Sequence, residues 1–147
     1  MKAPLSIIAL ALLAWTGCKE EALAPVAPVL TLVSISPTTV TAHTDSVRIA
    51  LIYSDAQGDI GELDPDEPSL SVRDQRLTTA DWVHIPPVTP DMMELSVSGA
   101  LDVVLPPLFL LGNGDQESTT FTLQLFDRAG NKSEPLVTPV ITILDTL

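Results

Sequence analysis

Hydrophobic and polar residues alternate with a period of two along most of the chain beyond residue 29. The segment SVRIALIY places Val47, Ile49, Leu51 and Tyr53 on one face and Arg48 on the other. Such alternation is typical of β-strands that bury one face. Further segments with this pattern, in full or in part, are 30–35, 69–73, 82–85, 93–105, 119–126 and 140–144. The pattern therefore predicts about seven short strands.

Turn-forming residues separate these segments. The chain has 13 prolines, with clusters of Asp, Gly and Asn between the apolar runs, and no helical stripe competes. Met93 and Leu95 extend the apolar face of the segment 93–105. Pro139 lies beside the last segment and predicts an edge strand or a bulge, because proline lacks an N–H. These features predict an all-β domain over residues 29–147, an antiparallel β-sandwich.

The first 17 residues have the order of a secretory signal peptide. Lys2 supplies the positive charge, and an apolar run, PLSIIALALLAW, is followed by Thr16 and Gly17. A helix of about 12 residues is roughly 18 Å long, which is shorter than the hydrocarbon core of a bilayer. A buried N-terminal helix or an uncleaved anchor are the alternatives. The charged residues that follow favour the signal peptide, residues 1–17.

The single cysteine, Cys18, follows this segment directly. The sequence TGC resembles the lipobox of bacterial lipoproteins, although Trp15 stands where that motif usually has leucine. The resemblance implies diacylglycerol on the Cys18 sulfur and an acyl chain on its amine, so the membrane would be a partner through the lipid anchor. Two or more acyl chains hold a protein firmly on the membrane. Cleavage that leaves a free thiol is the alternative.

The residues after the cysteine resemble those of Bacteroidetes surface lipoproteins. Lys19, Glu20 and Glu21 are similar to the export signal of that group, which implies an outer-membrane protein that faces the exterior. A polar linker on a periplasmic protein is the alternative. Residues 18–28 then form a lipidated Pro/Ala tether ahead of the domain.

Two segments resemble bacterial Ig-like domains: SISPTTVT at 34–41 and LFDRAGNKS at 125–133. The segment 53–67 is similar to a loop of small, uncharacterised Bacteroidetes lipoproteins. The resemblance implies an Ig-like β-sandwich and carries no activity with it.

The charge balance bears on partners. The chain has 7 basic and 19 acidic residues, a net charge of −12. Loss of Lys2 with the signal peptide would leave 6 basic residues (7 − 1) and a net charge of −13. Nucleic acid and anionic membrane surfaces are disfavoured, since both require basic patches. A protein partner on the cell envelope is compatible with this charge.

The acid-rich segment 55–67 is the one stretch that suggests a metal. Calcium binds six to eight oxygens in flexible loops, but the spacing here is not that of an EF-hand. In an Ig-like sandwich this segment is the B–C loop, and the turn 127–131 is the F–G loop at the same end. The predicted oxygen ligands of a structural calcium ion are Asp55, Asp59, Glu62, Asp64, Asp127 and Asn131. A solvated acidic loop is the alternative, and no cofactor is required.

No catalytic constellation is evident in the sequence. His43 and His84 lie in separate segments without a nucleophile motif, and one cysteine with two histidines gives no zinc spacing. Trp82 could stack on a sugar ring or fill the core of the sandwich. We therefore predict a non-enzymatic envelope lipoprotein that acts in adhesion, as a scaffold or as an accessory subunit. A glycan- or ligand-binding module of a surface uptake complex is the alternative.

Overall fold

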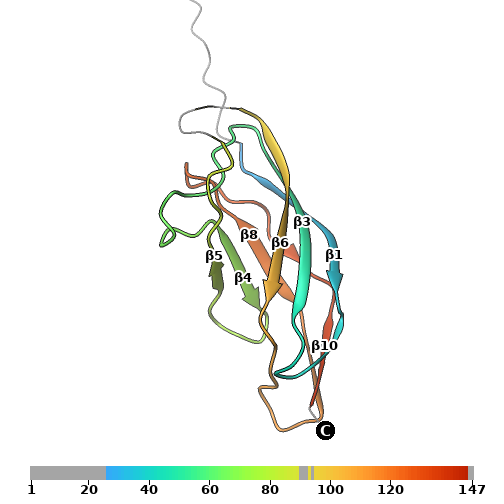
Figure 1. The fold of residues 1–147 in the computed structure, drawn as a ribbon. Coiled ribbons are helices and arrows are strands. Elements are labelled where there is room, and N and C mark those ends of the chain that lie inside the picture. The colour runs from blue at the N-terminus through green and yellow to red at the C-terminus, as the bar shows by residue number, and fades with distance from the viewer. Residues whose placement is uncertain (1–25, 90–92, 94, 146–147) are drawn as a thin grey trace, which may run out of the picture.

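The computed structural model describes residues 26–89, 93 and 95–145, and they form an all-β, Ig-like sandwich (Figure 1). The signal peptide and Cys18 predicted from the sequence lie outside the described residues. Ten strand segments occur: β1 (Val29–Ser36), β2 (Thr39–Thr41), β3 (Val47–Asp55), β4 (Leu70–Asp74), β5 (Asp81–Val83), β6 (Val97–Leu105), β7 (Gln116–Thr119), β8 (Phe121–Leu125), β9 (Leu136–Val137) and β10 (Ile141–Leu144). Within the described ranges, no helix is long and apolar enough to cross a membrane.

One layer has the strand order β1-β3-β6, with β3 antiparallel to both neighbours. The alternation read from the sequence appears here directly: Val47, Ile49 and Leu51 are buried, and Arg48 faces solvent. Arg48 pairs with Asp102 of β6 across the outer face at 2.7 Å. Both side chains are exposed, so this ion pair contributes little to stability.

The other layer combines two strand groups, β5-β4-β8-β9 and β2-β10-β7. β7 and β8 are separated only by Thr120, and β9 and β10 by residues 138–140. Each pair is therefore one interrupted strand, as are β1 and β2. Counting these three pairs once reduces ten segments to seven strands (10 − 3), which confirms the prediction. Pro139 lies in one of the interruptions, as expected for a residue that cannot donate to a ladder.

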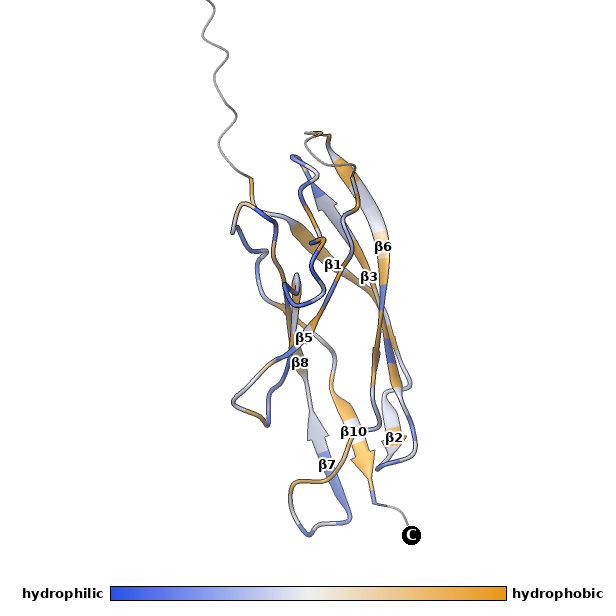
Figure 2. Ribbon diagram, turned by 60° about the vertical axis from the view of Figure 1, so that its left-hand side comes forward, coloured by the Kyte–Doolittle hydropathy of each residue, from blue (hydrophilic) through white to orange (hydrophobic). Residues whose placement is uncertain are grey.

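The core lies between the two layers. Its most enclosed side chains come from strands far apart in the sequence: Ile49 and Leu51 of β3, Leu70 of β4, and Leu123 of β8. Figure 2 shows apolar residues along β6 and β10 and polar ones along β7, which lies at the margin of its sheet. The period-two pattern thus identified the buried faces.

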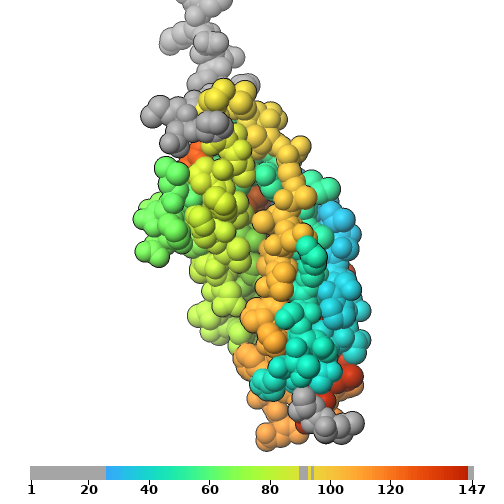
Figure 3. Space-filling model, in the orientation of Figure 1, coloured from blue at the N-terminus to red at the C-terminus, as the bar shows by residue number. Residues whose placement is uncertain are grey.

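The start of β6 differs from the prediction. The strand begins at Val97, and Met93 and Leu95 are about half exposed. The reason is a contact with the loop between β3 and β4. Gly58 has a φ of +69°, and a Cβ on it would lie 2.1 Å from the Leu95 carbonyl oxygen. The chain therefore packs against that loop before it enters the sheet. Figure 3 shows the same loop, in green, projecting from the side of the molecule.

Leu123 provides a direct test of this core. Leu123→Ala should lower the free energy of unfolding by about 2 to 5 kcal/mol, because the side chain is fully buried and leaves a cavity. Val104→Ala, on the exposed face of β6, should change it by less than about 0.5 kcal/mol. Urea unfolding of both variants checks the prediction, and equal losses would contradict the assignment of the buried face.

Candidate functional site

Two loops meet at one end of the sandwich, as the sequence predicted for the B–C and F–G loops. Ile60, in the β3–β4 loop, forms an antiparallel bridge with Asp127 in the β8–β9 loop. The backbone N–H of Arg128 donates to the Asp59 carbonyl at 2.9 Å, and its guanidinium donates to the Gly61 carbonyl at 3.0 Å. The loops are therefore joined along several residues.

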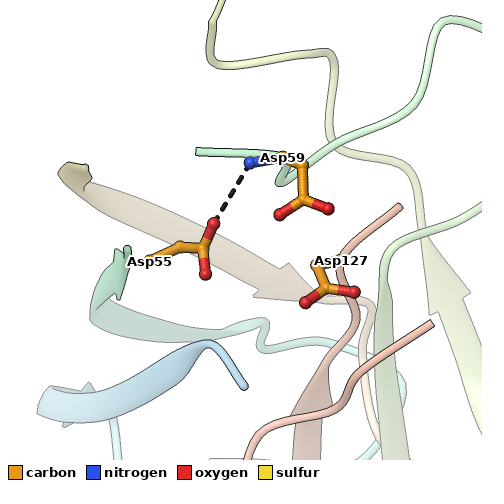
Figure 4. Close-up of side chains that lie close together, drawn as sticks. All are labelled: Asp55, Asp59 and Asp127. Carbon is orange, nitrogen blue, oxygen red and sulfur yellow. Dashed lines mark hydrogen bonds between the residues drawn. The ribbon is translucent and has the colours of Figure 1, made fainter. Parts of the chain in front are cut away.

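Three carboxylates face one another where the loops meet (Figure 4). Asp55, Asp59 and Asp127 each offer an oxygen, and these oxygens lie within 4.8 Å of one another. We call them the carboxylate triad. Asp55 Oδ2 accepts from the Asp59 N–H at 3.1 Å, and Asp59 Oδ2 accepts from the Ala129 N–H at 3.1 Å. One oxygen of each of these two groups is thus held by the backbone.

The carboxylates of the triad are largely buried, and two of their oxygens lack a hydrogen-bond partner among the described residues. Asp55 is 3% exposed and Asp127 is 6% exposed. The Oδ1 atoms of Asp55 and Asp59 are buried and have no hydrogen-bond partner among the described residues. Burial raises the pKa of Asp59 above its ordinary value, and the adjacent Asp55 carboxylate raises it further. Such a group of oxygens has the chemistry of a cation site.

The remaining predicted ligands are placed differently. Asn131 is joined to the triad because its side-chain amide donates to Asp127 Oδ2 at 2.8 Å. Glu62 and Asp64 do not belong to the triad. Asp64 is exposed, and its carboxylate accepts from the Asp66 N–H within a turn. The carbonyl of Glu62 contacts the His84 ring at 2.7 Å. Sequence spacing could not separate these acids, because the loop folds back between Gly58 and Gly61.

Trp82 lies on the outer face of the second layer, so the alternative in which it fills the core of the sandwich is wrong. It is 52% exposed and packs against Phe126, with ring centroids 5.4 Å apart and planes at 50°. Strand register explains this. Trp82 of β5 pairs with Ser71 of β4, which pairs with Gln124 of β8. These residues share the face opposite to buried Leu70.

The same face is hollowed beside the two rings. The hollow has a volume of about 500 Å³, and we call it the outer-face groove. It is lined by Ser71, Arg73, Ala80, Trp82, Thr122, Gln124, Phe126, Pro135 and Val137. The sequence contained a signal for this groove. Its lining residues in β4 and β8, which are Ser71, Arg73, Thr122 and Gln124, alternate with the apolar residues of the core.

The sequence pattern did not predict a partly buried ionic network. Arg76 donates to Asp74 at 2.7 Å and to Glu117 at 2.8 Å, and Glu117 also accepts from the N–H groups of Leu111 and Gly112. Burial alone would raise the pKa of Asp74, but hydrogen bonds from Arg76 and Thr119 lower it below its ordinary value. Backbone hydrogen bonds lower the pKa of Glu117 as well. The network joins β4 to β7 and to the loop before it.

Comparison with known proteins gives little further information. No protein-family model matches the sequence, and no curated protein matches it. Among solved structures, the chain is similar to a point mutant of the SrpA adhesin from Streptococcus sanguinis, at 14% sequence identity and a TM-score of 0.43. The similarity covers 82% of this chain and 57% of the adhesin chain. Similarity at this level carries no argument about function, which has to come from the side chains.

The pKa of Asp74 predicts a pH dependence of stability. Asp74→Asn should lower the free energy of unfolding near neutral pH by roughly 2 kcal/mol, because it removes charged hydrogen bonds to Arg76. In the unfolded chain the pKa is about 3.9, and in the folded chain it is lower. The contribution is therefore complete above that value and is lost as the pH falls through the folded pKa.

The difference between wild type and Asp74→Asn should accordingly shrink on acidification. Urea unfolding from about pH 6 to about pH 2.5 measures it. Asp59, whose pKa is raised, contributes a slope of the opposite sign in both proteins and cancels in the difference. A difference that stays constant over this range would contradict the prediction.

Proposed function

We propose that the protein is a lipid-anchored envelope protein whose Ig-like domain binds a neutral glycan, without catalysis, in the outer-face groove. The observation that carries the proposal is the exposed Trp82 ring packed against Phe126. Binding a glycan is one way in which an adhesion protein or an accessory subunit of an uptake complex works. The proposal therefore narrows the roles predicted from the sequence.

The chemistry of the groove supports a sugar ligand. Two aromatic rings offer an apolar surface to the C–H face of a sugar ring. Arg73 and Gln124 provide hydrogen-bond donors for hydroxyl groups beside them, and Ser71 and Thr122 add hydroxyls. A few polar groups around an apolar surface are typical of small-molecule sites.

The size of the groove favours a glycan over a protein. A hollow of about 500 Å³ lies within the range of small-ligand pockets, roughly 300–1,000 Å³. A stable protein interface needs about 800 Å² on each partner, considerably more than one pair of rings provides.

The lining of the groove also favours binding over hydrolysis. Glycosidases place two carboxyl groups on either side of the scissile bond. Among the described residues, the lining contains no carboxylate and no histidine. The buried acids of the triad and of the ionic network lie elsewhere in the domain.

The anchor is proposed from the sequence. Cys18 follows the signal peptide-like segment, and Lys19 and the two glutamates after it favour export to the outer surface. The described chain begins near the triad, since the Val26 N–H donates to the Gln57 side chain at 3.2 Å. A tether that enters at this end leaves the sheet face with Trp82 accessible to solvent.

Fluorescence tests the glycan proposal at one residue. The chain has two tryptophans, Trp15 and Trp82, and Trp15 lies in the predicted signal peptide, so the fluorescence of the mature chain reports on Trp82 alone. Maltoheptaose, xylohexaose and mannohexaose are the probes. We expect one of them to blue-shift the emission, and Phe126→Ala to weaken its binding about tenfold through loss of the ring contact.

Phe109→Ala is the matched control, because Phe109 is an exposed aromatic residue outside the groove. It should leave binding unchanged. Absence of a spectral change with every probe, or equal weakening by both substitutions, would count against a glycan site in this groove.

Palmitate labelling tests the anchor separately. The wild-type chain should incorporate labelled palmitate and partition into detergent, and Cys18→Ser should do neither, because it removes the only thiol of the chain. Trp15→Leu restores the usual lipobox residue and should be labelled at least as well as wild type. Equal labelling of Cys18→Ser would refute the anchor.

A further inference from the structure

We propose that Asp55, Asp59 and Asp127 bind a calcium ion that clamps the β3–β4 loop to the β8–β9 loop. The site is separate from the groove and does not depend on the glycan proposal. Besides the convergence of three acids, a second observation points to a ligand. Asp55 is almost completely buried, its carboxylate lies beside those of Asp59 and Asp127 (Figure 4), and its Oδ1 has no hydrogen-bond partner among the described residues.

The spacing of the oxygens suits calcium. Calcium binds oxygen at about 2.3–2.6 Å, so two of its ligands lie at most about 5 Å apart. The three oxygens of the triad lie within 4.8 Å of one another. Magnesium binds at about 2.0–2.1 Å and demands a near-ideal octahedron. Its ligands lie at most about 4.2 Å apart, a narrower limit than the 4.8 Å within which the triad oxygens lie.

The hydrogen bonds orient all three carboxylates and leave one oxygen of Asp55 and one of Asp59 free. The Oδ2 atoms of Asp55 and Asp59 accept backbone N–H groups, which fixes the orientation of each carboxylate. Their Oδ1 atoms remain available. Asp127 is oriented by Asn131, whose backbone and side-chain amides donate to it at 2.7 and 2.8 Å. Ligands held by an outer layer of donors are characteristic of metal sites.

No lysine, arginine or histidine of the described ranges forms an ion pair with the triad. Ion pairs between described residues involve Asp74, Asp102 and Glu117, none of which belongs to the triad. Arg128 lies on the adjoining segment, but its guanidinium donates to the Gly61 carbonyl. Buried carboxylates without a cationic partner repel one another and lose hydration. A divalent cation would remove both costs.

The surrounding chain is built to hold the loop in place. Gly58 and Gly61 flank Asp59, and a Cβ on Gly61 would lie 2.4 Å from the Pro86 carbonyl oxygen. Between them, Ile60 is fully buried and pairs with Asp127. The ion would therefore add a link between two loops whose backbones already lie side by side, and the remaining coordination positions would be filled by water.

Thermal unfolding of the full chain in detergent tests the site. For a dissociation constant of about 10 μM, about 1 mM calcium should raise the Tm by about 10 °C relative to EDTA. Calorimetric titration should show one ion bound per chain. Asp59→Asn should abolish the shift, and its Tm in EDTA should exceed that of wild type because the repulsion is reduced. Asp127→Asn provides the same test if Asp59→Asn does not fold.

Glu62→Gln and Asp64→Asn are the matched controls, since they remove a charge from the same loop outside the triad. Both should retain the full calcium shift, and magnesium at the same concentration should give a smaller one. Absence of a calcium shift in wild type would overturn the proposal. So would an equal loss of the shift in Asp64→Asn and Asp59→Asn, because that pattern indicates a diffuse ion atmosphere.

Discussion

Because successive side chains of a strand point to opposite faces of its sheet, the residues that build the core of this domain also determine which residues face solvent. In β4 and β8, burial of Leu70 and Leu123 places Ser71, Thr122 and Gln124 outside. The groove with Trp82 is thus a consequence of the core register. A shift of one residue in either strand would bury its polar residues and expose its apolar ones.

The interruptions between strands divide the second layer into two strand groups. At the break between β9 and β10, the backbone N–H of Thr138 donates to the Phe121 carbonyl, and the Thr138 hydroxyl accepts from the Phe121 N–H at 2.9 Å. Pro139 follows without leaving an unpaired donor in the ladder. The chain passes from pairing with β8 to pairing with β7 and β2. The strand group β5-β4-β8-β9, which carries the groove, is therefore separate from the group β2-β10-β7.

The two groups of buried acids show how context decides the behaviour of one residue type. Asp74 is buried but has Arg76 and Thr119 as donors, and its pKa falls. Asp59 is partly buried beside another carboxylate, and its pKa rises. The first arrangement stabilises the fold at neutral pH by itself. The second costs stability at neutral pH unless a cation compensates the charge, which is why we propose the triad, and not the network, as a binding site.

The sequence by itself determined the fold class and the buried faces of the longer strands, because period-two burial is a local signal. The expected Ig-like topology then predicted the meeting of the β3–β4 and β8–β9 loops. The sequence also supplied the hypothesis of a lipid anchor at Cys18. Only the tertiary structure selected Asp55, Asp59 and Asp127 from the predicted ligands, since the path of a loop between two glycines depends on what it packs against. It also decided that Trp82 faces outward, because the three-residue strand β5 is too short for its sequence to reveal its register.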